Sequence, residues 1–313
     1  MSIVLIVDAA CDLPKDFLDK RGIQLLPISI KVDEQIYIDD KDNHRLQAFY
    51  RQNLLTLKHE AESTPYSSGE IHQLVMRDIV PHYDFGLIQT VSQKRSAIHA
   101  NCIEAQALVQ KSCRQNKARG DTKRAFSMRV MNSGTLFTGQ GVLAAFTSDL
   151  IAANRSKHDI LRLAEAFKRK IYGFVIPPDV AYIRERARKR GETSLSALGA
   201  FVAKSLSIKP IIQAKNDATK PIAKVRGFDQ AVNRLFDYGV NRIKLGLLSP
   251  YVVVSIAGDI ADLKKFAGFL ELKAVAKLHK VEIISCVMGL TSGLNVGPGA
   301  VSLALAAEDH TFS

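Results

Sequence analysis

The sequence predicts an α/β protein of two domains: an N-terminal domain over residues 1–155 with a parallel sheet covered by helices on both faces, and a C-terminal α+β domain over residues 156–313 with its own sheet. Four strand–helix units follow one another in the first half, and helical crossovers between strands imply parallel pairing. From Ser156 onward this regular alternation stops. At 313 residues the chain is long enough for two domains of ordinary size.

The first half contains four apolar segments that we expect to be strands. Residues 3–7 are continuously apolar and β-branched, as in a strand buried on both faces. The expected strands cover residues 3–7, 23–32, 85–91 and 127–131. A helix is expected to start at residues 12–14, with Asp12 as the cap and Pro14 in the first turn, and further helices are expected over residues 45–57, 70–80, 97–116 and 138–153.

The second half is expected to build a separate sheet. A hairpin is predicted from two short strands joined by a turn at Asn216-Asp217. The expected strands cover residues 171–176, 207–212, 221–225, 252–257, 280–287 and 300–306, and the expected helices cover 156–169, 180–190, 193–205, 228–245 and 261–278.

Polar residues follow the predicted parallel strands of the first half. Asp8, the segment 92–96 and Asn132-Ser133 each come directly after an apolar strand. Ligands of parallel sheets bind outside the carboxyl ends of the strands, so we expect a site at this edge. Ser96 stands where a helix N-terminus would hold an anion, and an ordinary helix cap explains it equally well.

Two further segments carry polar or glycine-rich patterns. Residues 62–70 contain four hydroxyl groups, and one of the two later serines is expected to cap the helix that follows, with Glu70 in its first turn. Residues 292–299 read Ser-Gly-Leu-Asn-Val-Gly-Pro-Gly between two predicted strands. Such a loop is either a tight turn or a backbone cradle for an anion.

The composition excludes several classes of protein. No GxGxxG follows the first strand and no Walker loop occurs. The carboxylates of Asp33, Glu34, Asp39 and Asp40 lack calcium-loop spacing and are interpreted as a solvated turn, so no metal and no cofactor is expected. No signal peptide or spanning segment is evident, which predicts a cytoplasmic protein. The net charge of +12 favours anionic partners.

The order of short motifs along the whole chain resembles the DegV family, the fatty-acid-binding proteins that act as the FakB subunit of bacterial fatty acid kinase. These motifs lie at residues 6–14 (Asp, small residues, Asp-Leu-Pro), at Asp39, at 63–67, at 91–97, at Asn132-Ser133 with Gly139-Gln140-Gly141, at Tyr182-Ile183 with Arg188, at 208–211, at 224–226 and at 293–299. The resemblance implies a two-domain DegV-like fold.

The resemblance also implies a function and a site. A long-chain fatty acid would lie in an apolar tunnel between the domains, with the 59–70 loop packing on the second domain, and a separate fatty acid kinase would phosphorylate its carboxylate. The resemblance assigns carboxylate binding to Ser63, Thr64, Ser96 and Asn295, places Gly293, Gly297 and Gly299 in a loop near the ligand, and assigns partner or phosphate contacts to Arg188 and Arg226.

The chain departs from the family pattern at the head-group site. Asn295 stands where the family has a histidine, and a neutral amide replaces a side chain that can carry charge. A carrier or sensor of a different amphiphile is therefore the first alternative. A nucleic-acid-binding protein is a second, supported only by the net charge, and no nucleic acid is expected. A basic surface would also suit transient contact with an anionic membrane.

Overall fold

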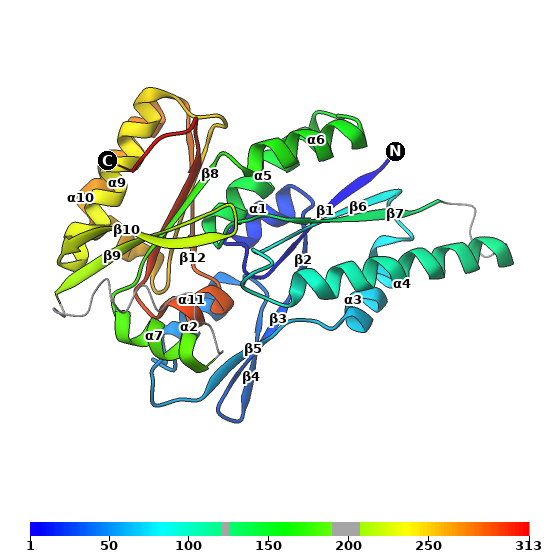
Figure 1. Cartoon of the computed structure of the whole chain (residues 1–313), viewed down its shortest axis with the longest axis horizontal. Helices are drawn as coiled ribbons and strands as arrows, with labels where there is room; N and C mark the ends of the chain where they lie inside the picture. The colour runs from blue at the N-terminus through cyan, green and yellow to red at the C-terminus, as the bar shows by residue number, and fades with distance from the viewer. Residues whose placement is uncertain (121–124, 190–206, 313) are drawn as a thin grey trace.

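The computed structural model describes residues 1–120, 125–189 and 207–312. The helix expected over 193–205 lies outside these residues. The first half contains β1 (Ile3–Asp8), α1 (Lys15–Lys20), β2 (Gln24–Leu26), β3 (Ile28–Val32), β4 (Gln35–Asp39), α2 (Asn43–Arg51), β5 (Ala61–Thr64), α3 (Ser68–Leu74), the π-helical turn η1 (Val75–Ile79), β6 (Phe85–Thr90), α4 (Ile98–Arg119), β7 (Ser127–Asn132) and α5 (Thr138–Ala152). Figure 1 shows their arrangement.

The remaining described elements follow α5. They are α6 (Lys157–Lys168), β8 (Ile171–Ile176), α7 (Val180–Lys189), β9 (Ile208–Lys215), β10 (Ala218–Arg226), α9 (Phe228–Leu245), β11 (Tyr251–Ile256), the 3-10 helix η2 (Ile260–Lys265), α10 (Ala267–Leu278), β12 (Glu282–Val287), α11 (Leu290–Val296) and β13 (Val301–Ala306).

The predicted parallel sheet is confirmed, with strand order β2-β1-β6-β7. Successive side chains of β1 point to opposite faces because a strand has a period of two. Leu5 and Val7 pack with α1, α5 and α6, whereas Val4 and Ile6 pack with α3 and α4. Helices therefore cover both faces, as expected from the continuously apolar strand.

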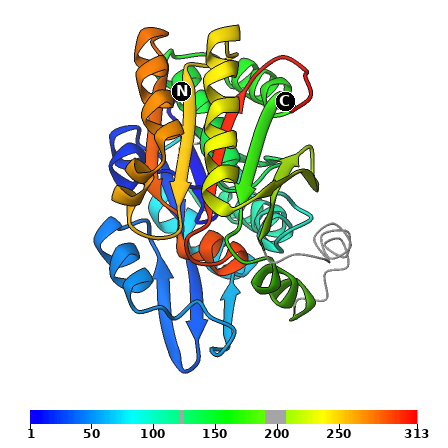
Figure 2. The ribbon, with the colours of Figure 1, turned by 90° about the vertical axis from the view of Figure 1, so that its left-hand side faces the viewer.

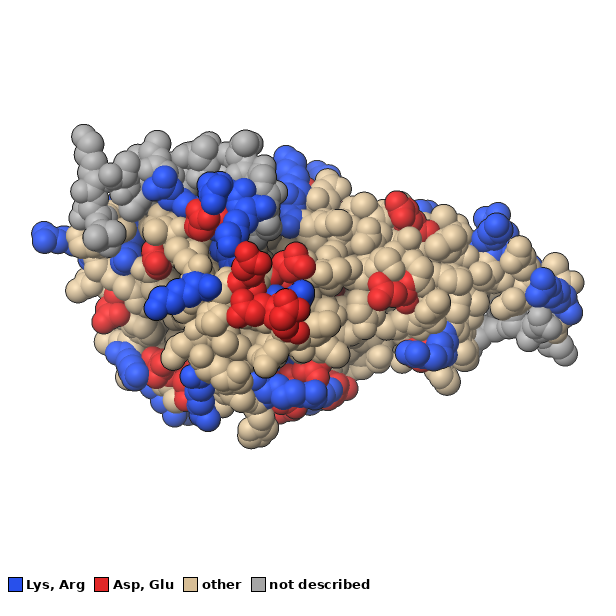
Figure 3. Space-filling model, turned by 90° about the horizontal axis from the view of Figure 1, so that it is seen from below, with Lys and Arg blue, Asp and Glu red and all other residues tan. Residues whose placement is uncertain are grey.

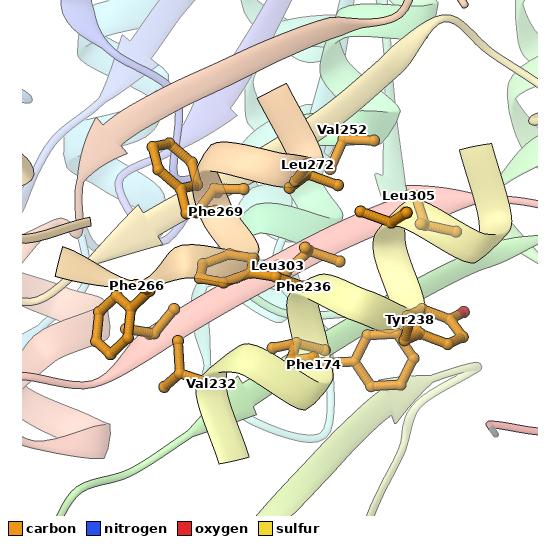
Figure 4. Packing of buried hydrophobic residues seen from close by; sticks show 14 of the residues in the cluster. Phe174, Val232, Phe236, Tyr238, Val252, Phe266, Phe269, Leu272, Leu303 and Leu305 are labelled. Atoms are coloured by element: carbon orange, nitrogen blue, oxygen red, sulfur yellow. The ribbon is translucent and has the colours of Figure 1, made fainter. Parts of the chain in front are cut away.

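The second half builds a six-stranded sheet in the order β10-β9-β8-β13-β11-β12, in which β11 and β12 are parallel and the other pairs are antiparallel. The helices α9 and α10 cover one face (Figure 2). Aromatic and aliphatic side chains such as Phe174, Phe236 and Leu303 fill that interface (Figure 4). The predicted hairpin is confirmed, with Asn216 and Asp217 in the turn at positive φ.

Helix α5 lies between the two large sheets (Figure 1). Its apolar side chains share one core cluster with Leu5 and Val7 of β1 and with Tyr251 and Val253 of β11. The molecule is therefore layered from α3 and α4 through the parallel sheet, α5 and the six-stranded sheet to α9 and α10. The two halves are joined by buried apolar contact.

A small antiparallel sheet, β4-β3-β5, was not predicted. The segment 23–32, expected as one strand, is divided at Pro27 into β2 and β3, which belong to different sheets. Proline lacks the backbone donor that a continuous ladder needs, so it marks the division. This small sheet packs with α2, α7 and α11.

Candidate functional site

A cavity of about 110 Å³ lies where the carboxyl edge of the parallel sheet faces the six-stranded sheet. Its apolar lining comes from both halves of the chain and consists of Ala10, Ile28, Pro65, Val91, Leu136, Phe137, Val175, Ile183, Ile212 and Val296. Its polar lining consists of Ser63, Arg95, Ser96, Thr219, Thr291 and Asn295. An apolar space with a few convergent polar groups is the usual form of a small-molecule site.

Asp8 holds the cavity edge of the parallel sheet together. Its carboxylate accepts from the backbone N–H groups of Ala10 at 2.8 Å and Val91 at 2.7 Å, and both of these residues line the cavity. Burial raises the pKa of Asp8, and the backbone hydrogen bonds oppose that rise. The carboxylate therefore positions two wall residues, which is a structural role.

The β9–β10 hairpin of the second half is fastened onto the same edge. The carboxylate of Asp217 accepts from Ser92 Oγ at 2.6 Å and from Asn132 Nδ2 at 2.7 Å, and its backbone N–H donates to the carbonyl of Gly134 at 2.8 Å. The hairpin brings Ile212 and Thr219 into the cavity lining. One wall of the cavity thus depends on a polar contact between the two halves.

A buried charge group fixes the start of α11. Lys41 is 1% exposed, and its Nζ lies 3.6 Å from Asp12 Oδ1 and 3.6 Å from Asp39 Oδ1. Asp12 also accepts from the N–H of Gly289 at 3.1 Å, and Asp39 accepts from the N–H of Thr291 at 2.8 Å. Burial raises the pKa of Asp12, while the ammonium of Lys41 opposes that rise. We call these three side chains the buried ion trio.

The buried ion trio corrects two expectations. Asp12 is not the cap of the first helix, because α1 begins only after Pro14 and the carboxylate of Asp12 points into the interior. Asp39 does not lie in a solvated turn, because it is fully buried at the end of β4. The ammonium group of Lys41 lies 3.6 Å from a carboxylate oxygen of each aspartate and compensates their buried negative charge.

Three of the four predicted carboxylate-binding residues line the cavity: Ser63, Ser96 and Asn295. Thr64 follows Ser63 on β5, so its side chain points to the opposite face; it is exposed and does not line the cavity. Ser96 Oγ accepts from the N–H of Ile98 at 3.2 Å, which leaves its own hydroxyl hydrogen to donate.

The glycine-rich segment is a helix over most of its length, which corrects the expected loop. Residues 290–296 form α11, Pro298 and Gly299 form the turn that follows, and Gly297 and Gly299 have positive φ. Gly293 lies inside the helix against the hydroxyl of Tyr50. One N–H of the Asn295 amide donates to the carbonyl of Thr291 at 2.7 Å. One of its two donor hydrogens is therefore used within its own helix.

The two predicted arginines lie at the surface. Arg188 is exposed and pairs with Glu185 on the same helix, and Arg226 is exposed at the end of β10. Neither lines the cavity. Their assignment to partner contacts stays a prediction.

Sequence reasoning missed Arg186, which is 5% exposed and donates to the carbonyl of Ala61 at 2.6 Å. Arg186 also lines an open cleft of about 740 Å³ that shares Ser63 with the cavity. The other lining residues of this cleft are Lys31, Asp33, Glu34, Glu60, Ala61, Glu62, Lys189 and Leu294. Figure 3 shows acidic side chains gathered into one group on the face seen from below, with basic side chains around them.

Two kinds of feature are absent from residues 1–120, 125–189 and 207–312. No group of three or more His, Cys, Asp or Glu side chains in these ranges has an arrangement that could hold a metal ion. No helix in this part of the chain is both long enough and apolar enough to cross a bilayer.

Comparison with known proteins gives one consistent result. The family profile described as "Uncharacterised protein, DegV family" matches residues 2–308. A DegV domain-containing protein of Xanthomonas axonopodis pv. citri is 35% identical over 313 residues, which is 100% of both chains.

Among solved structures, DegV of Bacillus subtilis, described as a fatty acid binding protein, has a TM-score of 0.76 at 20% identity and covers 98% of this chain and 100% of its own. The fatty acid kinase (Fak) B3 protein of Streptococcus pneumoniae, loaded with linoleic acid, has a TM-score of 0.70 at 16% identity and covers 98% of this chain and 99% of its own. These likenesses establish the fold. Because the family profile spans nearly the whole chain, the protein belongs to the DegV family.

Proposed function

We propose that the protein binds a long-chain fatty acid in the cavity between the two large sheets, with the acyl chain against the apolar walls and the carboxylate at the hydroxyl groups of Ser63 and Ser96. The observation that carries this proposal is the lining itself, which combines a mainly apolar wall from both halves with hydroxyl donors. Solved relatives of the same fold are described as fatty-acid-binding proteins, which supports the choice of ligand.

The energetics suit this ligand. Each methylene group moved from water into an apolar wall contributes about 0.8 kcal/mol, so a long chain supplies most of the binding energy. The polar groups then fix the direction in which the chain enters, because a carboxylate is too costly to bury without partners.

The size of the cavity sets a condition on binding. At about 110 Å³ it is smaller than the ~150 Å³ apolar cavity that accepts a benzene molecule. A long acyl chain therefore requires the walls to move apart on loading. The turn of the β9–β10 hairpin is held to the opposite half by hydrogen bonds of Asp217, which can break and re-form. We therefore expect this hairpin to shift on loading.

We further propose that this carrier is cytoplasmic and presents the carboxylate to a separate fatty acid kinase, with no cofactor of its own. The likeness to the Streptococcus pneumoniae protein supports the kinase as partner. Arg188 and Arg226, both exposed, are the proposed contacts for that partner or for phosphate. The net charge of +12 suits transient contact with an anionic membrane, from which a fatty acid is extracted.

Native mass spectrometry of the protein purified from cells tests fatty acid binding. We expect a bound mass in the range of long-chain fatty acids, its loss on delipidation, and its return when palmitate is added. A protein that carries no acyl chain and takes up none after delipidation would contradict the proposal.

A second candidate is a carrier of an uncharged or differently charged amphiphile. The observation in its favour is that Asn295 is neutral and already donates one hydrogen bond to Thr291. Extraction of the bound lipid and its identification by mass spectrometry separates the two candidates.

The substitution Asn295→His tests whether α11 meets the head group. A histidine can add a charge-assisted hydrogen bond, so we expect palmitate to bind more tightly, by about 1–2 kcal/mol, below the histidine pKa. Titration calorimetry at two pH values provides the measurement. An unchanged affinity at both would mean that residue 295 does not contact the carboxylate.

A further inference from the structure

We propose that Arg95 is the charged partner of the ligand's carboxylate and makes the cavity selective for anionic amphiphiles over neutral ones. This inference rests on the proposed function, since it assigns the head-group charge of the same ligand. The motif at residues 91–97 contains Arg95, but the resemblance assigns a role there only to Ser96.

Arg95 lies at the mouth of the cavity. It lines the cavity together with Ser96, and the same two residues also line an open depression of about 730 Å³ on the outer surface. The other residues of this depression are Gln93, Lys94, Ala97, His99 and Ala100. A ligand whose tail fills the cavity therefore has its head group beside Arg95 and Ser96 when it faces this depression.

The charges on the two sides of the cavity favour this mouth. Among the described residues that line the cavity, Arg95 is the only one with a formal charge. The depression on its outer side adds Lys94. The open cleft that shares Ser63 with the cavity instead contains four carboxylates against three basic side chains. A carboxylate that faces the depression is attracted by Arg95 and Lys94, whereas one that faces the open cleft beyond Ser63 meets more negative than positive charge.

The other polar side chains that line the cavity are uncharged, so among the lining residues that the structure describes only Arg95 can form an ion pair with a carboxylate. Asn295 is neutral and shares its amide with Thr291, and the hydroxyls of Ser63 and Ser96 carry no charge. An arginine keeps its charge at every physiological pH and can bind a carboxylate through two parallel N–H donors. Arg95 already takes part in an interaction within the chain, so the ligand shares or displaces that contact.

The turn that carries Arg95 is fixed by the rest of the fold. The backbone N–H of Arg95 donates to the carbonyl of Ser92 at 2.8 Å. Ser92 in turn is held by Asp217 of the opposite half. The guanidinium group is therefore attached to a backbone whose position relative to the cavity is set by both halves.

The test compares palmitate with cetyl alcohol, which has the same chain length and no charge, on delipidated full-length protein. We expect the unmodified protein to prefer palmitate, and Arg95→Gln to weaken palmitate binding by about tenfold or more while alcohol binding stays within twofold. Arg95→Lys should restore part of the preference. Lys277→Gln, which removes an exposed charge on α10 outside both the cavity and the depression, should leave the ratio unchanged.

The outcomes separate the two proposals. If Arg95→Gln and Arg95→Lys bind both lipids with the unmodified ratio, Arg95 is not the carboxylate partner, although fatty acid binding stands. If the unmodified protein binds neither lipid, the proposed function fails and this inference fails with it. Circular dichroism and thermal unfolding of each variant confirm that a changed ratio does not reflect loss of the fold.

Discussion

At the scale of single residues, the buried ion trio has the largest expected effect on stability. Removing Lys41 leaves the carboxylates of Asp12 and Asp39 buried without a counter-charge. We expect Lys41→Met to lower the free energy of unfolding by about 3–5 kcal/mol, as measured by denaturant titration. Lys31→Met, which breaks a more exposed pair with Glu34, should cost about 0–1 kcal/mol. Equal effects would show that burial of the trio is unimportant.

The pH dependence of Lys41 follows from the same environment. Burial lowers the pKa of Lys41, but the charges of Asp39 and Asp12 outweigh burial and the pKa is raised. Its contribution to stability is therefore complete below the ordinary lysine pKa and is lost as the pH rises through the raised value.

Asp12 and Asp39 also show why part of the site was not predictable. An aspartate before Leu-Pro has the pattern of a helix cap, and an aspartate among other acids has the pattern of a solvated turn. What buries them is contact with Lys41 and with the backbone at Gly289 and Thr291. Those partners are far apart in sequence, and no local pattern encodes such a contact.

At the scale of elements, the β9–β10 hairpin couples the two halves at the cavity. We expect Asp217→Ala to destabilise the protein by about 1–3 kcal/mol, because Ser92 and Asn132 lose their acceptor. Hydrogen exchange of the hairpin amides should rise, and stopped-flow exchange of bound fatty acid should become faster.

Asp19→Ala is the matched control for Asp217→Ala, because it breaks only an exposed pair with Lys15. It should leave the hairpin amides and ligand exchange unaltered. If Asp217→Ala gives the same ligand exchange rate as this control, the hairpin does not control entry to the cavity.

The elements differ in how well the sequence predicted them. Helix α9 has the predicted bounds because its apolar face has the helical period and glycines stand at both ends. The predicted helix over 261–278 is divided into η2 and α10 at Phe266. The predicted serine cap is confirmed, since Ser67 forms a capping box with Glu70.

Helix α11 shows the opposite case. Glycine, serine and asparagine are poor helix formers, so its sequence favours a loop. Its first backbone N–H groups are held by Asp12 and Asp39, and its side chains pack in a buried cluster. Tertiary contacts therefore override local propensity at the segment that carries Asn295.

At the scale of the whole molecule, the shared core around α5 predicts that both halves unfold together. Leu235→Ala in α9 removes a fully buried side chain and should lower stability by about 2–5 kcal/mol. Hydrogen exchange should then show the same loss of protection in β6 as in β11.

Leu245→Ala, at the exposed end of the same helix, is the matched control and should change neither strand. Loss of protection in β11 alone after Leu235→Ala would indicate that the halves are independent folding units.

The fold class was predictable because periodicity and chain order determine it. A cavity lies at the carboxyl edge where the sequence predicted a site, and the binding role of its residues stays a prediction. The boundary near Arg155 stays a prediction. The third sheet was missed although Pro27 marks its start. The size of the cavity depends on side chains from two sheets, from helices and from the loops after the parallel strands, and no motif connects them.

Two glycines of α5 have a consequence for the dimensions of the molecule. A methyl group added at Gly141 would lie 2.8 Å from the backbone oxygen of Asp12. A methyl group added at Gly139 would collide with the side chain of Thr135, whose hydroxyl donates a hydrogen bond to the carbonyl of Ala214 in the six-stranded sheet. Hydrogen-sized side chains thus set the gap between the two large sheets. The width of the cavity therefore depends on Gly139 and Gly141, although neither residue lines the cavity.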